Sequence, residues 1–271
     1  MELLRAAEPQ GLQLFQRPGA SIAAVRNFGA EQSSSDYVAF LDADCSIEPD
    51  YAIIAVNTLE RTGAAATGCE VDIPPQPHWI EAAWHELHHV GVERDVAYLN
   101  SGNFFTRRDV FQRLGGFRDS LTTGEDAELG QRYNEAGYRV HASPAVRAVH
   151  YGNPQSIGQF YRRMVWHGLG MFGTVNLRRI DKPTAMMALH LLLVLAGIAC
   201  VASAERAWET RLALLLASQG AVPLMTVLYR MRTTRRYTPL LHGTWLYWLY
   251  YLARLQALSL IALGRAERYR K

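Results

Sequence analysis

The sequence contains little cysteine and no recognisable secretory signal, and both absences bear on where the protein works. Its 271 residues include only three cysteines, Cys45, Cys69 and Cys200, which are far apart. An odd number of distant cysteines predicts neither a disulfide framework nor a paired-thiol zinc site, so we expect a reducing compartment. The first residues, MELLRAAEPQG, are charged and lack the apolar core of a signal peptide.

Acidic residues are scarce in the second half of the chain. Only 4 Asp and Glu residues follow residue 150, against 16 Arg and Lys, whereas residues 1–150 hold 21 acidic residues and 12 Arg. The net charge of +3 therefore conceals an acidic half joined to a basic half. The basic half is also the more apolar, which is not the pattern of a nucleic-acid-binding protein. We expect no nucleic-acid partner.

Two runs without a formally charged residue, 184–203 and 212–229, are long enough to cross a membrane. A helix of ~20 apolar residues spans a hydrocarbon layer of ~30 Å. The alternative is a pair of buried helices in a soluble core. Because arginines cluster beside both runs, we expect transmembrane helices, with the N-terminal domain and the loop 230–236 in the cytoplasm. This predicts the inner (cytoplasmic) membrane as the location and membrane lipids as partners.

A third hydrophobic segment, 240–264, completes a predicted membrane region over residues 183–271. Arg254 interrupts this segment, and a charge at the bilayer centre costs about 2.5–3.5 kcal/mol. We therefore expect a re-entrant or interfacial segment, with the C-terminus in the cytoplasm. Upstream, residues 155–182 are predicted to form an amphipathic bridge. It is either an interfacial helix on anionic headgroups or an ordinary surface helix packed on the domain.

Residues 1–154 alternate short apolar runs with segments of helical periodicity. The run YVAFL at 37–41 is typical of a buried strand, whereas 79–93 and 125–136 have the spacing of amphipathic helices. Strands that alternate with helices favour an α/β fold. We therefore predict a Rossmann-like α/β domain with a mainly parallel sheet.

Two acidic motifs lie at the ends of predicted elements in this domain. Asp42 and Asp44 directly follow the strand at 37–41, and Glu125 and Asp126 open a helix. Ligands of open α/β sheets bind at the carboxyl ends of strands, where two carboxylates can share Mg²⁺ or Mn²⁺. A carboxylate beside such an ion can accept a proton from a hydroxyl group. The alternatives are a solvated turn and a helix N-terminus stabilised by acidic residues.

The two motifs belong to an ordered series of short elements. The series comprises RN at 26–27, YVAFLDAD at 37–44, SGNFFTRR at 101–108, GGF at 115–117, TGED at 123–126 and AVHYG at 148–152. It resembles the family-2 glycosyltransferases of the GT-A fold, over roughly residues 1–180. The resemblance implies a metal-dependent, inverting enzyme. Such an enzyme moves a sugar from a nucleotide-diphosphate sugar, with UDP the default nucleotide, to a hydroxyl of a lipid-linked or polysaccharide acceptor.

The resemblance also implies roles for the acidic motifs and for a histidine. Asp42 and Asp44 match the metal-binding DxD of the family, with Asp44 the more direct ligand of Mn²⁺ or Mg²⁺. His150 is either a third metal or diphosphate contact or a buried histidine at a strand end. Asp126 matches the general base that deprotonates the acceptor hydroxyl, and Glu125 supports the site or contacts the acceptor.

Further residues are implied to bind the donor, which acts as the co-substrate. Arg26 and Asn27 match an element that lies near the nucleotide in the family, and the resemblance implies that Asp42 lies beside the donor diphosphate. Gly102 and Asn103 match the part of the family pattern that lines the sugar site.

Two departures from the family pattern affect these expectations. The family begins with a strand–helix unit that contacts the nucleotide, whereas this chain starts inside the following helix. We therefore expect an N-terminally incomplete domain, an unpaired sheet edge and weak donor binding by this chain alone. The segment 159–163 is similar to the QxxRW element of processive synthases, but Arg163 replaces the tryptophan, which argues against a polymerase.

A competing motif of the form HExxH lies at residues 85–89. On a helix, His85 and His89 share one face, as zinc ligands do in metalloproteases whose base is the intervening glutamate, here Glu86. A third ligand is required, for which Glu93 lies one turn further on. A zinc metalloprotease is therefore one alternative function. A catalytically inactive membrane-anchored remnant is another. The simplest interpretation of the motif itself is an amphipathic helix with no catalytic role. The sequence does not predict the oligomeric state.

Overall fold

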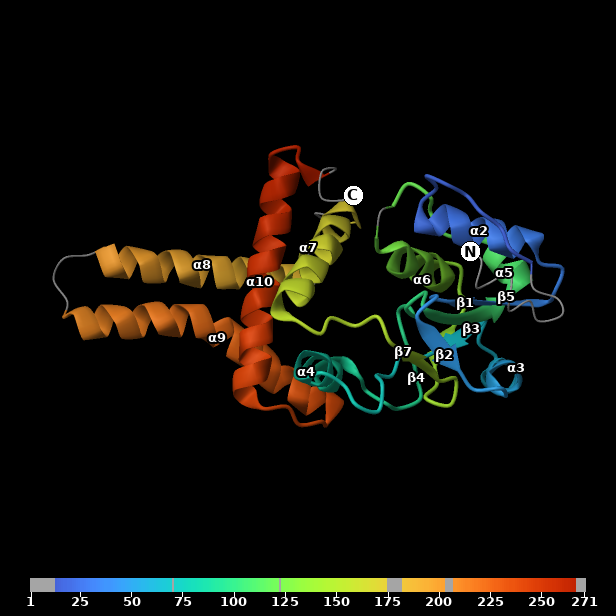
Figure 1. Ribbon diagram of the computed structural model, residues 1–271, viewed down its shortest axis with the longest axis horizontal. Helices are drawn as coiled ribbons and strands as arrows, with labels where there is room; N and C mark the ends of the chain where they lie inside the picture. The colour runs from blue at the N-terminus through green and yellow to red at the C-terminus, as the bar shows by residue number, and fades with distance from the viewer. Residues whose placement is uncertain (1–12, 70, 122, 175–181, 203–206, 267–271) are drawn as a thin grey trace.

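The computed structural model describes residues 13–69, 71–121, 123–174, 182–202 and 207–266, in an α/β domain and a helical region that lie along one long axis (Figure 1). The strands are β1 (Tyr37–Leu41), β2 (Cys45–Ile47), β3 (Ala66–Gly68), β4 (Arg94–Asp95), β5 (Asn103–Arg107), β6 (Val140–Ala142) and β7 (Ala148–His150). The helices of the α/β domain are α2 (Ile22–Gln32), α3 (Tyr51–Thr62), α5 (Arg108–Arg113) and α6 (Glu125–Glu135). The helical region contains α4 (Trp79–His88), α7 (Ile157–Thr174), α8 (Lys182–Ala202), α9 (Trp208–Thr234) and α10 (Leu240–Ala262).

The α/β class is confirmed, but the sheet is mixed rather than mainly parallel. Its strand order is β1-β5-β3-β6-β4, and only β3 and β6 pair in parallel among the described strands. β5 lies between β1 and β3 and runs antiparallel to both. Among the described residues, β1 has a hydrogen-bonded neighbour on one side only, and a groove lined by α2 and β1 follows its outer edge.

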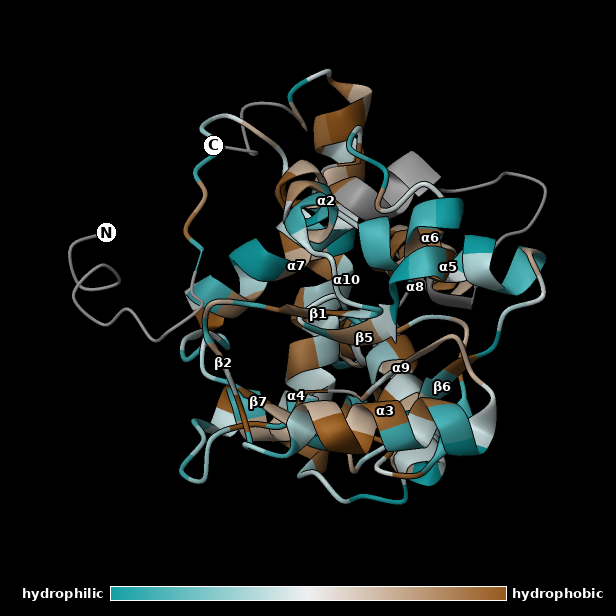
Figure 2. Ribbon diagram, turned by 90° about the vertical axis from the view of Figure 1, so that its right-hand side faces the viewer, coloured by the Kyte–Doolittle hydropathy of each residue, from teal (hydrophilic) through white to brown (hydrophobic). Residues whose placement is uncertain are grey.

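Alternating side chains of β5 explain why the sheet is covered on both faces. Phe104 packs with Phe40, Phe111 and Phe117 in one core cluster, while Phe105 lies in another cluster beside α3. Successive strand residues point to opposite faces, so a strand that is apolar on both faces must be covered on both. Seen from the end of the α/β domain, α5 and α6 present mostly hydrophilic residues to the outside (Figure 2).

Helices α8 and α9 run side by side and project away from the α/β domain (Figure 1). Residues 184–202 and 208–234 are long and apolar enough to cross a membrane, and only 17% of each apolar stretch is buried within the protein. Their outward side chains include Leu192 and Leu216, which are 64% and 62% exposed. A hairpin that displays so much apolar surface is not the core of a soluble domain.

The apolar face of α7 is buried against α10 of the predicted membrane region rather than against the α/β domain, and an interfacial position of the bridge stays a prediction. Phe160, Met164 and Val165 lie in one core cluster with Leu246 and other residues of α10. The physical reason is that α10 presents its own apolar stripe to α7, so burial needs no lipid. The rest of the predicted bridge, residues 175–181, lies outside the described residues.

Candidate active site

The two acidic motifs meet at Arg26 of α2. Its Nη2 donates to Asp42 Oδ1 at 2.5 Å, and its Nη1 donates to Glu125 Oε1 at 2.7 Å. Asp42 follows β1 and Glu125 opens α6, so one guanidinium joins the ends of two elements that are far apart in the sequence. The arrangement brings the DxD and ED motifs to one place, as the family resemblance requires.

The loop before β5 closes against the same site. A Cβ atom at Gly102 would lie 2.7 Å from Asp42 Oδ2, so a larger residue would displace that carboxylate. Ser101 Oγ donates to Glu125 Oε1 at 3.3 Å, and the Gly102 amide donates to Asn100 Oδ1 at 2.8 Å. The backbone of the SGN motif therefore lies close to the carboxylates of Asp42 and Glu125.

Two predicted donor-binding residues use their amide groups inside the protein. Asn103 is completely buried, accepts from the Tyr51 hydroxyl at 2.7 Å and donates to the Val146 carbonyl at 2.9 Å. The structure places Asn103 behind the site, which corrects the expectation that it lines a sugar pocket. Asn27 donates to the Phe117 carbonyl at 2.7 Å and accepts from the Phe117 amide at 2.8 Å. It fixes the GGF turn against α2.

Asp126 lies in the first turn of α6, beside Glu125. Burial raises the pKa of the Asp126 carboxyl, and the neighbouring Glu125 charge raises it further. Hydrogen bonds from the backbone amides of Ala127 and Ser101, together with the charge of Arg26, act in the opposite direction. Gly124 at the N-cap has φ of 83°, a backbone conformation that glycine adopts without strain, and it sets the direction in which α6 begins. The result is a half-buried carboxyl with an enhanced affinity for a proton.

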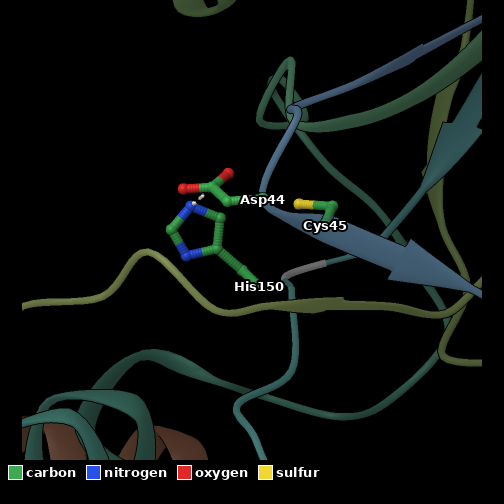
Figure 3. A group of neighbouring side chains, drawn as sticks. All are labelled: Asp44, Cys45 and His150. Atoms are coloured by element: carbon green, nitrogen blue, oxygen red, sulfur yellow. Dashed lines mark ion pairs between the residues drawn. The ribbon is translucent and has the colours of Figure 1, made fainter. Parts of the chain in front are cut away.

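The carboxylate of Asp44, the second aspartate of the DxD motif, faces the imidazole of His150 (Figure 3). His150 Nε2 lies 3.3 Å from Asp44 Oδ1, and Cys45 lies close enough for its sulfur to join them. The antiparallel pairing of β2 and β7 sets Cys45 opposite His150, which explains why residues so distant in sequence come together. Burial, followed by the charge of Asp42, raises the pKa of the Cys45 thiol, so the thiol form is favoured over the thiolate that binds metals.

His150 is held by a residue that the sequence analysis did not single out. Its Nδ1 lies 3.0 Å from Asn153 Oδ1, and Asn153 donates in turn to Glu81 of α4 at 2.7 Å. If Nδ1 carries the proton, Nε2 keeps its lone pair toward Asp44, as metal-binding histidines require. The residues present therefore fit a divalent cation bound by Asp44 and His150.

Arg163 is a second residue that sequence reasoning assigned no role. Its Nη2 donates to the Gly152 carbonyl at 2.6 Å, and a side chain at Gly152 would overlap Asp44. Burial lowers the pKa of Arg163, while the nearby charges of Asp44 and Asp42 act in the opposite direction. The sequence did contain a feature that could have pointed to Arg163, because arginine replaces the tryptophan that processive synthases have at this position.

The HExxH residues form a separate cluster on the other side of β7. His85 and His89 lie together as predicted, but the third group beside them is Asp72 rather than Glu93. Glu93 pairs with Arg61 at 2.5 Å instead. The approach of His85, followed by the guanidinium of Arg147, lowers the pKa of the Asp72 carboxyl to about 2, against the effect of its partial burial.

Comparison with known proteins defines the class. Residues 37–263 match the family model described as glycosyl transferase family group 2, and the chain belongs to that family. It is 28% identical over 166 residues to glycosyltransferase AglE of Haloferax volcanii, covering 58% of this chain and 54% of AglE. It is 29% identical over 151 residues to succinoglycan biosynthesis protein ExoM of Rhizobium meliloti, covering 53% and 49% of the two chains. The chain thus spans about half the length of these curated relatives.

The solved structure of the mannosyltransferase PcManGT from Pyrobaculum calidifontis, in complex with GDP-Man and Mn²⁺, is also similar. The match covers 90% of this chain and 68% of PcManGT, with 15% sequence identity and a TM-score of 0.47.

Proposed function

We propose that this chain catalyses inverting transfer of a sugar from a nucleotide-diphosphate sugar to a hydroxyl of a lipid-linked or polysaccharide acceptor. The observation that carries the proposal is Arg26, which joins Asp42 of the DxD motif to Glu125 of the ED motif. Family membership supports it, as do relatives named for glycosyl transfer and succinoglycan biosynthesis.

Asp126 is the general base of the proposed reaction. The acceptor hydroxyl loses its proton to this carboxylate as its oxygen attacks the anomeric carbon from the face opposite the leaving group. Such a displacement inverts the configuration and needs no nucleophile from the enzyme. A raised pKa makes the carboxylate a stronger base, and general-base assistance contributes about 10²–10⁴-fold in rate.

Asp44 and His150 are the proposed ligands of Mn²⁺ or Mg²⁺. When bound, the cation offsets the charge that develops on the departing diphosphate. Asp42 shares its charge with Arg26, so we assign it mainly to positioning the donor beside Arg26 and Gly102. The proposed donor carries uridine diphosphate, the default that the family resemblance implies.

The α8–α9 hairpin is the proposed membrane anchor. Arg236, just beyond the end of α9, lies 3.2 Å from Glu86 of α4, and this basic end of the hairpin is the end nearer the α/β domain (Figure 1). Clusters of arginine remain on the cytoplasmic side of a membrane. This supports a catalytic domain that faces the cytoplasm at the inner membrane, where nucleotide sugars are made.

Donor turnover by the purified chain in detergent tests the proposal. We expect Mn²⁺-dependent release of UDP from a UDP-sugar, and loss of that release in Asp44→Ala. The matched control is Asp50→Ala, because Asp50 is exposed and makes no side-chain cap bond to α3. Equal release by wild type and Asp44→Ala would overturn the metal assignment. A wild type that is folded but inactive toward every donor would favour the inactive remnant instead.

A further inference from the structure

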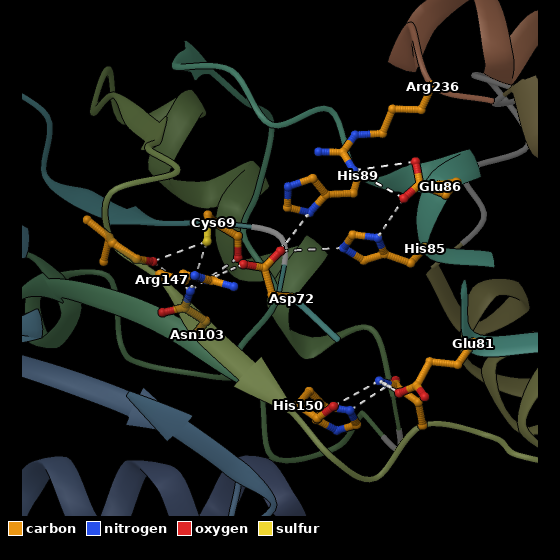
Figure 4. A network of polar contacts seen from close by, with 12 residues as sticks. Cys69, Asp72, Glu81, His85, Glu86, His89, Asn103, Arg147, His150 and Arg236 are labelled. Atoms are coloured by element: carbon orange, nitrogen blue, oxygen red, sulfur yellow. Dashed lines mark hydrogen bonds and ion pairs between the residues drawn. The ribbon is translucent and has the colours of Figure 1, made fainter. Parts of the chain in front are cut away.

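We propose that Asp72, His85 and His89 form a second metal site, suited to Zn²⁺, that fastens α4 to the α/β domain. His85 Nε2 lies 3.6 Å from Asp72 Oδ1, and His89 Nδ1 lies 3.8 Å from the same oxygen. The two imidazole rings are stacked with centroids 4.5 Å apart. Figure 4 shows the three side chains converging from the C-terminal end of α4 and from the loop after β3.

These separations match those of ligands around one ion. Zinc binds nitrogen and carboxylate oxygen at about 2.0–2.2 Å in tetrahedral sites, which places neighbouring ligands roughly 3.3–3.5 Å apart. The observed separations from the Asp72 oxygen exceed that spacing by only a few tenths of an ångström. Two imidazoles and one carboxylate suit a borderline ion such as Zn²⁺ better than Mg²⁺ or Ca²⁺, which prefer oxygen alone.

Charged groups surround the cluster on two sides. Arg147 Nε donates to Asp72 Oδ2 and leaves Oδ1 facing the histidines. On the far side of His85, Nδ1 lies 3.8 Å from Glu86 Oε1. Histidine ligands typically donate their second N–H to a carboxylate, which fixes the ring. Both buried ring nitrogens of His85 have no hydrogen-bond partner within the described part of the chain, so a bound ion would satisfy one of them.

The same contacts argue against peptidase chemistry. A metalloprotease needs the glutamate of its HExxH motif as a free base for water on the metal. Here Arg236 Nη1 donates to both oxygens of Glu86, at 3.2 and 3.4 Å. The glutamate is therefore tied to the residue just beyond the membrane hairpin and is not a free base.

The position of Asp72 gives the ion its role. The Asp72 amide donates to the Ala148 carbonyl at 2.8 Å, and the Asp72 carbonyl accepts from the His150 amide at 2.9 Å. A metal bound to the Asp72 side chain would thus connect α4 to β7, the strand that ends in His150 of the candidate active site. We assign the second ion a structural role, in which it holds the α/β domain against α4 of the helical region.

Zinc content and thermal unfolding of the full chain in detergent test this site. The protein is purified without chelators, stripped and titrated with Zn²⁺, and bound zinc is measured by elemental analysis. We expect wild type to hold one more zinc per chain than His85→Gln or Asp72→Asn, and zinc to raise the melting temperature of wild type by several degrees. His242→Gln is the matched control, since His242 is exposed and lies outside the cluster.

Two further measurements distinguish this site from the transferase site and from a folding defect. Asp44→Ala should keep the zinc, which separates this site from the proposed transferase site. If the cluster variants fail to fold, Co²⁺ added to stripped wild type should give the intense visible bands of a tetrahedral site. Wild type that binds no zinc, or cluster variants that bind as much as wild type, would overturn the proposal, as would Co²⁺ without those bands.

Discussion

The two clusters of carboxylate and imidazole groups differ in the solvent exposure of their carboxylates. In the cluster at the DxD motif, the Asp44 side chain is 46% exposed and the His150 side chain is 13% exposed. In the cluster on α4, the side chains of Asp72, His85 and His89 are 21%, 10% and 9% exposed. Catalytic metal sites keep a position open for substrate, whereas structural sites are closed by protein. The difference agrees with the two proposals, in which the first cluster binds substrate and the second supports the fold.

The charged contacts of the two clusters also differ. Asp44 packs against Gly152, where a Cβ atom would overlap its carboxylate, and Arg163 donates to the Gly152 carbonyl rather than to Asp44 itself. In the other cluster, Arg147 pairs directly with Asp72, and Arg236 pairs with Glu86 beside His85. Four experiments test this contrast, beginning with the largest expected effect.

Brief chelation should separate the two clusters completely. We expect EDTA to reduce sugar transfer to background within the mixing time, and added Mn²⁺ to restore it, because the open cluster exchanges its ion with solvent. Zinc in the closed cluster should remain bound over the same interval. The measurement is donor turnover with parallel elemental analysis of the protein. Transfer that survives EDTA at full rate would contradict a metal at Asp44.

Gly152→Ala should reduce transfer by about 100-fold, because misplacing a reacting group by about 1 Å can cost that much. The new methyl group would overlap Asp44 and displace it. Gly29→Ala is the matched control, since a Cβ at Gly29 meets nothing within 4 Å. The measurement is kcat at saturating Mn²⁺ for both variants. Near-normal turnover by Gly152→Ala would show that Asp44 need not stay where it is.

Transfer should fall as the medium becomes acidic, because the base must be unprotonated to act. The pKa of Asp126 is raised, so the fall should begin above the pH at which an ordinary aspartate titrates and should approach tenfold per pH unit. The zinc-dependent rise in melting temperature reports the other cluster, and it should not follow this profile. A rate profile of kcat against pH provides the check, and a flat profile down to pH 4 would contradict a base of raised pKa.

Arg163→Lys should have the smallest effect of the four. Lysine keeps the charge but loses the guanidinium that reaches the Gly152 carbonyl, so we expect about a tenfold rise in the Mn²⁺ concentration needed for half-maximal activity. Arg162→Lys, at the exposed neighbouring position, should leave that concentration unchanged. Identical Mn²⁺ dependence in the two variants would remove Arg163 from the site.

Part of this organisation could be predicted from local sequence patterns. The apolar run at 37–41 followed by acidic residues indicated a strand that ends at a site, and the spacing of His85 and His89 placed both on one side of a helix. Both inferences use the repeat of a single element. The family resemblance added the grouping of Asp42 with Glu125, which no local pattern contains.

The features that the sequence did not predict depend on contacts between elements that are distant in the sequence. Strand periodicity does not specify that β5 inserts between β1 and β3, so the antiparallel order was missed. Asp72 joins the histidines only because its loop pairs with β7. Similarly, the apolar stripe of α7 predicts burial but does not say whether lipid or another helix covers it.

The most direct test of the account compares sugar transfer by wild type, Asp126→Asn and Asp50→Asn at neutral pH. We expect Asp126→Asn to lose about 10²–10⁴-fold in kcat while Asp50→Asn stays at the wild-type rate. Because the pKa of Asp126 is raised on folding, its charge opposes folding at neutral pH, so the asparagine variant should melt at or above the wild-type temperature. A folded Asp126→Asn variant that transfers sugar at the wild-type rate would contradict the account.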